Sequence, residues 1–284
     1  MHRLIHLLLS AAILTMACAS EPETFDERLK AGEQAFVSGE YFKARGYLLE
    51  ALKEKPSDRD LLYLLGVTYS RELMHDSALF YLGRANTLYS DDREINLVLY
   101  EAALKVEDWE AARAALRVMV ETGDPIQSHL EELAELSIQM EDLSWAHYYF
   151  GQLMQSEPDN PNRWVQTANT AADMGSLYVA IDLVDSAIAK FGPNESFLAN
   201  KGIYYAVLHQ YTKSEEIFRS LILADSTAIA YRINLASALA SQDKPQKKRE
   251  ALQIFRMVRN AVGPDAQLDS LIDVLESEVG VPGE

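Results

Sequence analysis

Histidine and cysteine are the side chains of this sequence that could bind a metal or support catalysis. The six histidines are His2, His6, His75, His129, His147 and His209. The last four lack the i, i+4 spacing and the neighbouring cysteines that place several ligands on one metal ion. The sequence also lacks a phosphate-binding loop, a Gly-x-Ser-x-Gly turn and a dinucleotide fingerprint. We therefore expect a protein that is not an enzyme and that binds no metal or cofactor, with His75 and His209 solvated in turns.

Cys18 is the only cysteine, so the chain cannot form an internal disulfide. It follows the positive segment 1–3 and an apolar run over 4–14, which is too short to cross a bilayer. Residues 14–18, Leu-Thr-Met-Ala-Cys, resemble the lipobox of bacterial lipoproteins, although the leucine lies one position further from the cysteine than usual. The resemblance implies that residues 1–17 are a removed signal peptide, that Cys18 carries palmitate or another acyl chain, and that residues 18–24 include a short tether. The alternative is an ordinary secretory signal that is cleaved after Ala19.

The composition is that of a folded protein with an acidic surface. Hydrophobic residues make up 48% of the chain and charged residues 24%, and the net charge is −17. Nucleic-acid binding needs clustered lysine and arginine to replace condensed counterions, so this charge argues against a nucleic-acid partner. It favours basic partners without identifying one.

A 34-residue repeat that begins at residue 25 organises most of the chain. Its blocks are 25–58, 59–92, 93–126, 127–160, 161–194, 195–228 and 229–264, and the last contains about three additional residues near Pro245. Position 20 of the first six blocks is small, namely Ala44, Ala78, Ala112, Ala146, Ala180 and Ser214. Position 8 is also small in most blocks, and positions 24 and 27 are mainly apolar. Within a block the apolar residues recur with the period of a helix.

These positions resemble the tetratricopeptide repeat (TPR) family, over about nine tenths of the chain that follows the signal. The resemblance implies an all-α fold, a right-handed superhelical α-solenoid of about seven helical hairpins. It also implies that the small residues at positions 8 and 20 lie where the two helices of a hairpin, A and B, cross. Residues 265–284 predict a capping helix over 266–279 and a short tail, because the last hairpin would otherwise expose its apolar side.

In this family the concave surface is formed by positions 2, 5, 9, 12 and 13 of helix A. The candidate partner-binding residues are Tyr63, Arg71, Glu101, Glu135, Asn169, Asn200 and Ile203. The surface is acidic and mixed in its first half and more apolar in its second half, which suits a peptide with a basic end and an apolar end. The alternative is that its apolar residues pack inside the superhelix. Asn169 and Asn200 match the asparagines of the family's carboxylate clamp, but the clamp's cationic positions are not cationic here, so we expect no clamp.

Four cations stand close together near the start of the last hairpin's second helix. They are Lys244, Lys247, Lys248 and Arg249. The helix macrodipole disfavours positive charge at this end, so the cluster is either a docking patch for anionic headgroups or an acidic protein, or a solvated loop.

We expect a non-enzymatic protein-interaction scaffold that is lipid-anchored in a bacterial cell envelope. If the enterobacterial sorting rule for lipoproteins applies, Ala19 in place of aspartate after Cys18 favours the outer membrane over the inner membrane. The alternatives are a soluble periplasmic or secreted protein, a self-assembling structural component, and a solute- or glycan-binding module. That module would use Tyr63, Tyr69, Tyr204 and Tyr205 around a pocket.

Overall fold

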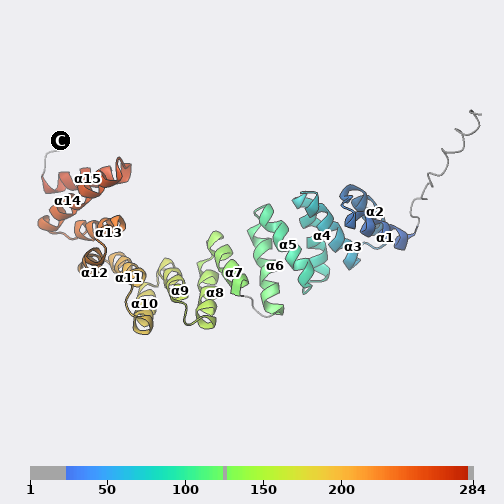
Figure 1. The fold of residues 1–284 in the computed structure, drawn as a ribbon, viewed down its shortest axis with the longest axis horizontal. Coiled ribbons are helices and arrows are strands. Elements are labelled where there is room, and N and C mark those ends of the chain that lie inside the picture. The colour runs from blue at the N-terminus through green and yellow to red at the C-terminus, as the bar shows by residue number, and fades with distance from the viewer. Residues whose placement is uncertain (1–23, 124–126, 281–284) are drawn as a thin grey trace, which may run out of the picture. The chain divides into compact units, whose positions relative to one another are not determined.

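The computed structural model describes residues 24–123 and 127–280. These residues form fifteen α-helices and no strands (Figure 1). The chain divides into two compact units, Met1–Pro125 and Ile126–Glu284. The predicted signal peptide, Cys18 and residues 281–284 lie outside the described residues. The predicted all-α fold of successive helical hairpins is confirmed.

The first unit contains three hairpins. Its helices are α1 (Phe25–Val37), α2 (Tyr41–Glu54), α3 (Arg59–Arg71), α4 (His75–Leu88), α5 (Arg93–Lys105) and α6 (Trp109–Thr122). Helices α1, α3 and α5 are A helices and begin at the first position of the 34-residue frame. Each B helix packs on its own A helix, and within this unit α2 also contacts α3 and α4 contacts α5.

The second unit contains four hairpins and one further helix. Its helices are α7 (Gln127–Gln139), α8 (Leu143–Ser156), α9 (Pro161–Asp173), α10 (Leu177–Phe191), α11 (Glu195–Val207), α12 (Tyr211–Ala224), α13 (Ile229–Ala240), α14 (Pro245–Val262) and α15 (Ala266–Val279). Helix α15 has the range predicted for the cap and buries Leu268 and Leu275 in the core that it shares with α14. Two ion pairs with α14, Arg259–Asp269 at 2.9 Å and Arg256–Glu276 at 2.6 Å, flank these leucines.

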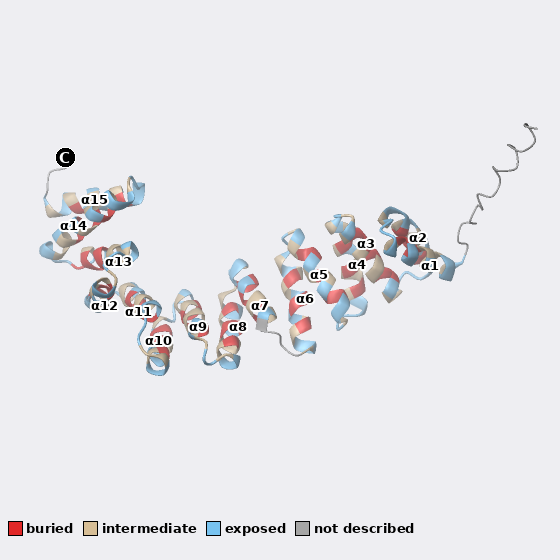
Figure 2. Cartoon of the chain, in the orientation of Figure 1, coloured by how far each residue is buried: buried red, intermediate tan, exposed pale blue. Residues whose placement is uncertain are grey.

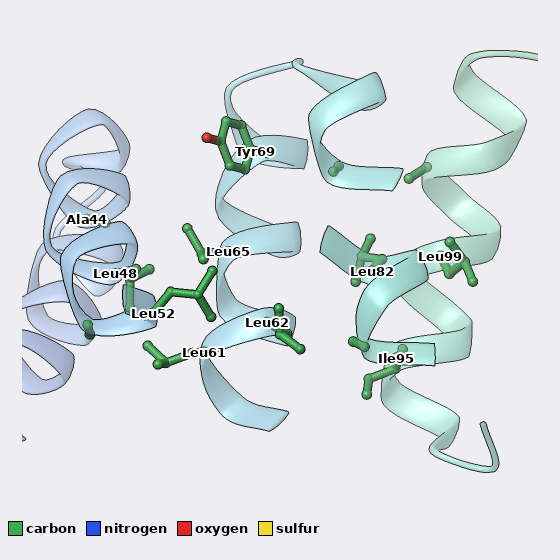
Figure 3. Packing of buried hydrophobic residues seen from close by; sticks show 14 of the residues in the cluster. Ala44, Leu48, Leu52, Leu61, Leu62, Leu65, Tyr69, Leu82, Ile95 and Leu99 are labelled. Atoms are coloured by element: carbon green, nitrogen blue, oxygen red, sulfur yellow. The ribbon is translucent and has the colours of Figure 1, made fainter. Parts of the chain in front are cut away.

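Small residues let the two helices of a hairpin approach closely. The position-20 residues are completely buried in all of the first six hairpins. At position 8, a Cβ on Gly32 would lie 2.7 Å from Leu48 Cδ2, and one on Gly202 would lie 2.9 Å from the Phe218 ring. At Gly32, Gly66 and Gly202 the space left by the glycine is thus filled by the large position-24 side chain of the facing helix. Figure 3 shows two of these position-24 side chains, Leu48 and Leu82, in the buried cluster. In Figure 2 the buried residues accordingly line the sides on which successive helices meet.

The turn between helices A and B has the same conformation in the first six hairpins. Its residue with positive φ is always at position 15, namely Gly39, Leu73, Glu107, Glu141, Gly175 and His209. The next N–H donates to a carbonyl five residues earlier, as from Glu40 to Ala35, which is the Schellman arrangement that ends a helix. In the seventh hairpin no residue has positive φ at this turn, and α14 is extended to 18 residues.

The structure differs from the prediction for His75. We expected a solvated turn residue, but His75 is the first residue of α4 and its Nδ1 is buried without a hydrogen-bond partner in the described part of the chain. His209 does lie in a turn.

Candidate interaction surfaces

The candidate residues of the first unit lie on helices α3 and α5. Arg71 and Glu101 are exposed, whereas Tyr63 is half-buried. The Arg59 guanidinium carbon lies 5.0 Å from the centre of the Tyr63 ring, and burial raises the pKa of the Tyr63 hydroxyl. Arg71 and Glu101 are therefore accessible to a partner, while Tyr63 also belongs to the packing between the hairpins.

Part of the acidic surface is used to join consecutive hairpins. Arg59 of α3 donates to Asp92 at 2.8 Å and to Glu94 at 2.6 Å. The pKa of Asp92 is lowered, first by its hydrogen bond to Arg59. In the second unit, Arg163 of α9 similarly bonds to Glu131 at 2.8 Å and to Glu157 at 2.9 Å. Each arginine thus balances part of the charge of two of these carboxylates, which reduces their attraction for a basic partner.

The candidate residues of the second unit divide into exposed and internally bonded residues. Glu135 and Ile203 are exposed. Asn169 accepts a 2.6 Å hydrogen bond from the Tyr204 hydroxyl, and Asn200 donates a 2.9 Å bond to the Ser196 carbonyl. The two asparagines that matched the carboxylate clamp are therefore half-buried and bonded to the chain itself.

The A helices also expose large apolar side chains at the predicted groove positions. In the first unit Leu97 is 42% exposed, and in the second unit Ile138, Ile203 and Val207 are 46%, 40% and 56% exposed. These side chains lie outside the buried cores, so their burial is not needed for the hairpins to pack. Single exposed apolar residues are common on monomeric proteins, and they mark a binding surface where they form a contiguous patch.

The tyrosines of the alternative pocket are mostly used in packing. Tyr69 is buried and its ring stacks on Tyr81, with the centroids 5.2 Å apart. Tyr204 is buried against Asn169, and burial raises the pKa of its hydroxyl. Tyr63 and Tyr205 are half-buried. This set of residues gives little support to a solute pocket.

The cation cluster is partly neutralised by neighbouring helices. Lys247 bonds to Glu215 of α12 at 2.5 Å, and Lys248 lies 3.1 Å from Glu278 of α15. Lys244 and Arg249 are exposed. The negative charges of Glu215 and Glu278 compensate for the unfavourable interaction between the lysines and the positive end of the α14 macrodipole.

Glu215 is the centre of a polar network that sequence reasoning missed. Its side chain is 9% exposed and accepts hydrogen bonds from Lys247, from Arg219 at 2.9 Å and from Gln242 at 2.8 Å. Burial raises the pKa of this carboxyl, but the three donors outweigh burial and lower the pKa from 4.5 to about 2. The signal available in the sequence was the pairing of one glutamate with a lysine 32 residues later, close to one repeat length.

Two of the described histidines contact hydroxyl groups. His147 Nδ1 lies 3.0 Å from Thr170 Oγ1, and His209 Nδ1 lies 2.5 Å from the Tyr211 hydroxyl oxygen. Among residues 24–123 and 127–280 there is no group of three or more His, Cys, Asp or Glu side chains arranged to hold a metal ion. None of the helices in these two ranges is long and apolar enough to span a membrane.

No protein-family model matches the sequence, and no curated protein matches it. Similar solved structures include a TPR protein from Parabacteroides merdae ATCC 43184, with 13% identity over 88% of this chain and 98% of that chain, and a TM-score of 0.47. YrrB, a TPR protein with an unusual peptide-binding site, has 15% identity over 65% of this chain and 95% of its own, with a TM-score of 0.44. The MamA protein has 17% identity over 60% of this chain and 96% of its own, with a TM-score of 0.42. Sequence identity is low in all three cases.

Proposed function

We propose that this chain is a non-enzymatic protein-interaction scaffold that binds its partner on the exposed face of the A helices. One observation carries the proposal: Leu97, Ile138 and Ile203 are large apolar residues exposed at groove positions of the repeat. A polar residue at such a position would leave the hairpin core intact, so packing does not require these side chains to be apolar. A partner that covers them would gain the free energy of removing apolar surface from water.

In each unit, acidic residues on the A helices accompany these apolar side chains and indicate the chemistry of the partner. Glu33 and Glu101 are exposed at position 9 of α1 and α5, and Glu135 is exposed at position 9 of α7. A peptide that carries lysine or arginine beside apolar side chains would complement both features. The net charge of −17 would favour its approach at low salt.

We further propose that the scaffold is anchored to a bacterial envelope membrane, preferably the outer membrane, through a lipid on Cys18. The support is in the sequence alone, where the apolar run over 4–14 leads to a sole cysteine in a lipobox-like setting. An anchor would confine the scaffold to a membrane surface and so raise the local concentration of envelope partners.

Site-specific photo-crosslinking in the native host tests the binding face. A benzoylphenylalanine at residue 203 should give a crosslinked adduct, because Ile203 lies on the proposed surface. The same group at Glu216, which is exposed on the B helix of the same hairpin, is the matched control and should give none. Equal adduct yields at the two positions, or no adduct at residue 203, would show that the A-helix face is not the binding surface.

The lipid anchor is tested separately. Radiolabelled palmitate should label the wild-type protein and not Cys18→Ser, and the variant should move from the membrane fraction to the soluble fraction. Equal labelling of the two proteins would exclude Cys18 as the lipidated residue without affecting the proposal for the groove.

A further inference from the structure

Helix α8 carries no acidic or basic residue other than His147, although charged residues make up 24% of the chain. It is helix B of the fourth hairpin and contains no Asp, Glu, Lys or Arg between Leu143 and Ser156. Trp145 and Tyr148 are 41% and 51% exposed on it, and Gln152 and Gln155 follow at helical spacing. Because these residues recur at i, i+3, i+7 and i+10, they form one stripe along a single side of the helix. We refer to them as the α8 stripe.

The two exposed rings are held in place by a third ring below them. Tyr149 is buried, and the Trp145 ring stacks on it with the centroids 5.5 Å apart and an angle of 25° between the planes. Tyr148 meets Trp145 edge to face at 5.4 Å and Tyr149 at 5.3 Å. The aromatic surface is therefore ordered before any ligand arrives, which reduces the entropy lost on binding.

The chemistry of the α8 stripe selects among ligands. The negative face of an aromatic ring attracts the C–H groups on the flat side of a sugar, and glutamine amides both donate hydrogen bonds to hydroxyls and accept them. An anionic headgroup or acidic peptide would find no lysine or arginine on this helix, and the single histidine, His147, contacts Thr170. An apolar helix would find two amides at the end of the stripe, which it would leave unpaired.

We propose that the α8 stripe binds a neutral oligosaccharide, with sugar rings stacked on Trp145 and Tyr148 and hydroxyls bonded to Gln152 and Gln155. A neutral chain avoids the repulsion that the net charge of −17 exerts on acidic polysaccharides. The stripe lies on a B helix (α8 in Figure 1), whereas the proposed protein-binding residues are on A helices, so the two sites use different residues.

The test uses the full chain with the signal removed and Cys18 replaced by serine. Isothermal titration with neutral hexasaccharides of β-1,4-glucose, α-1,4-glucose and β-1,4-mannose should give a Kd below roughly 1 mM for at least one of them. A hexasaccharide of galacturonic acid should not bind. Trp145→Ala should weaken the neutral sugar by about 10-fold or more, while Trp145→Phe should retain most of the affinity.

Phe80→Ala is the matched control. Phe80 is 59% exposed at position 22 of the frame, the position that Tyr148 occupies in its own hairpin, but it lies on the charged helix α4. Its loss should leave sugar binding unchanged. The proposal is overturned if no neutral sugar binds, or if Trp145→Ala and Phe80→Ala weaken binding equally. It is also overturned if Trp145→Ala only converts an oligomer to a monomer in sedimentation, since the stripe would then be a contact between copies of this chain.

Discussion

Ser214 departs from the alanine found at position 20 of the five preceding hairpins. It is completely buried, and its hydroxyl oxygen has no hydrogen-bond partner within the described residues. Removing an unsatisfied buried hydroxyl without leaving a cavity recovers desolvation energy. We predict that Ser214→Ala raises the free energy of unfolding by about 1 kcal/mol, measured by urea denaturation.

The matched control for Ser214 is Ala180→Ser, which places a hydroxyl at the equivalent buried position of the preceding hairpin. It should lower the stability by a similar amount. A Ser214→Ala protein that is less stable than the wild type would mean that the hydroxyl has a partner in solution, such as a bound water.

Glu215 should make stability depend on acidic pH. Because its folded pKa of about 2 lies below its ordinary value of 4.5, its contribution is fully present above pH 4.5. That contribution is lost as the pH falls toward 2, and it is on the order of 2 kcal/mol. We predict that Glu215→Gln is less stable than the wild type at pH 7 and that this difference shrinks steadily between pH 5 and pH 2.

Denaturant unfolding at a series of pH values measures this difference. Glu216→Gln, on the exposed side of the same helix, is the control and should match the wild type throughout. A deficit of Glu215→Gln that stays constant down to pH 2 would show that the carboxylate does not titrate as its three donors require.

At the scale of the elements, the repeated turn explains how six hairpins obtain the same geometry from different sequences. Gly39 and Gly175 adopt positive φ without strain, but Leu73, Glu107, Glu141 and His209 adopt it at a cost. We predict that Glu107→Gly raises the free energy of unfolding by about 1 kcal/mol. Thermal unfolding followed by circular dichroism measures this change.

A glycine within the preceding helix is the control for the turn. Glu101→Gly lies on the exposed face of α5, where the backbone is helical, and should cost about 1 kcal/mol. If Glu107→Gly raises the free energy of unfolding and Glu101→Gly lowers it, the turn conformation determines the change at Glu107, because both variants lose the same charge. Destabilisation by both changes would contradict a strained turn at Glu107.

The elements were more predictable from the sequence than their polar contacts. Small residues at positions 8 and 20 fix where two helices cross, and this steric rule repeats every 34 residues, so the helix ranges follow from the frame. The predicted range of α15 is the observed one. Ion pairs such as Glu215–Lys247 join hairpins through long side chains whose directions the repeat does not specify. The four-cation cluster therefore looked unpaired in the sequence, although two of its members have partners.

For the predicted groove residues, too, the sequence predicted the helix positions but not the polar contacts. The frame placed Arg71, Glu101 and Ile203 on A helices, where they are exposed. It could not indicate that Asn169 would be bonded to Tyr204, because the frame places the helices but does not specify the directions of their side chains. The α8 stripe was not predicted because all of the groove positions considered lie on helix A. The absence of lysine, arginine, aspartate and glutamate in α8 is nevertheless visible in the sequence.

At the scale of the whole molecule, a stack of hairpins has no single central core. Each hairpin is stabilised mainly by its neighbours, so a helix that covers the side of the last hairpin has a large effect on stability. In the second unit α15 has this role, because Leu268 and Leu275 complete the apolar cluster that contains Phe255 and Val258 of α14. Burial of each leucine contributes about 1.5–3 kcal/mol.

We predict that truncation after Gly263, which removes α15, lowers the melting temperature by roughly 5–10 °C. The exposed apolar side of α14 should also make the truncated protein associate in a concentration-dependent way, as measured by light scattering. Truncation after Gly280, which removes only residues 281–284, is the control and should behave like the full chain. If removal of α15 leaves both the melting temperature and the light-scattering mass unchanged, the four hairpins alone stabilise the second unit. Helix α15 would then not act as a cap.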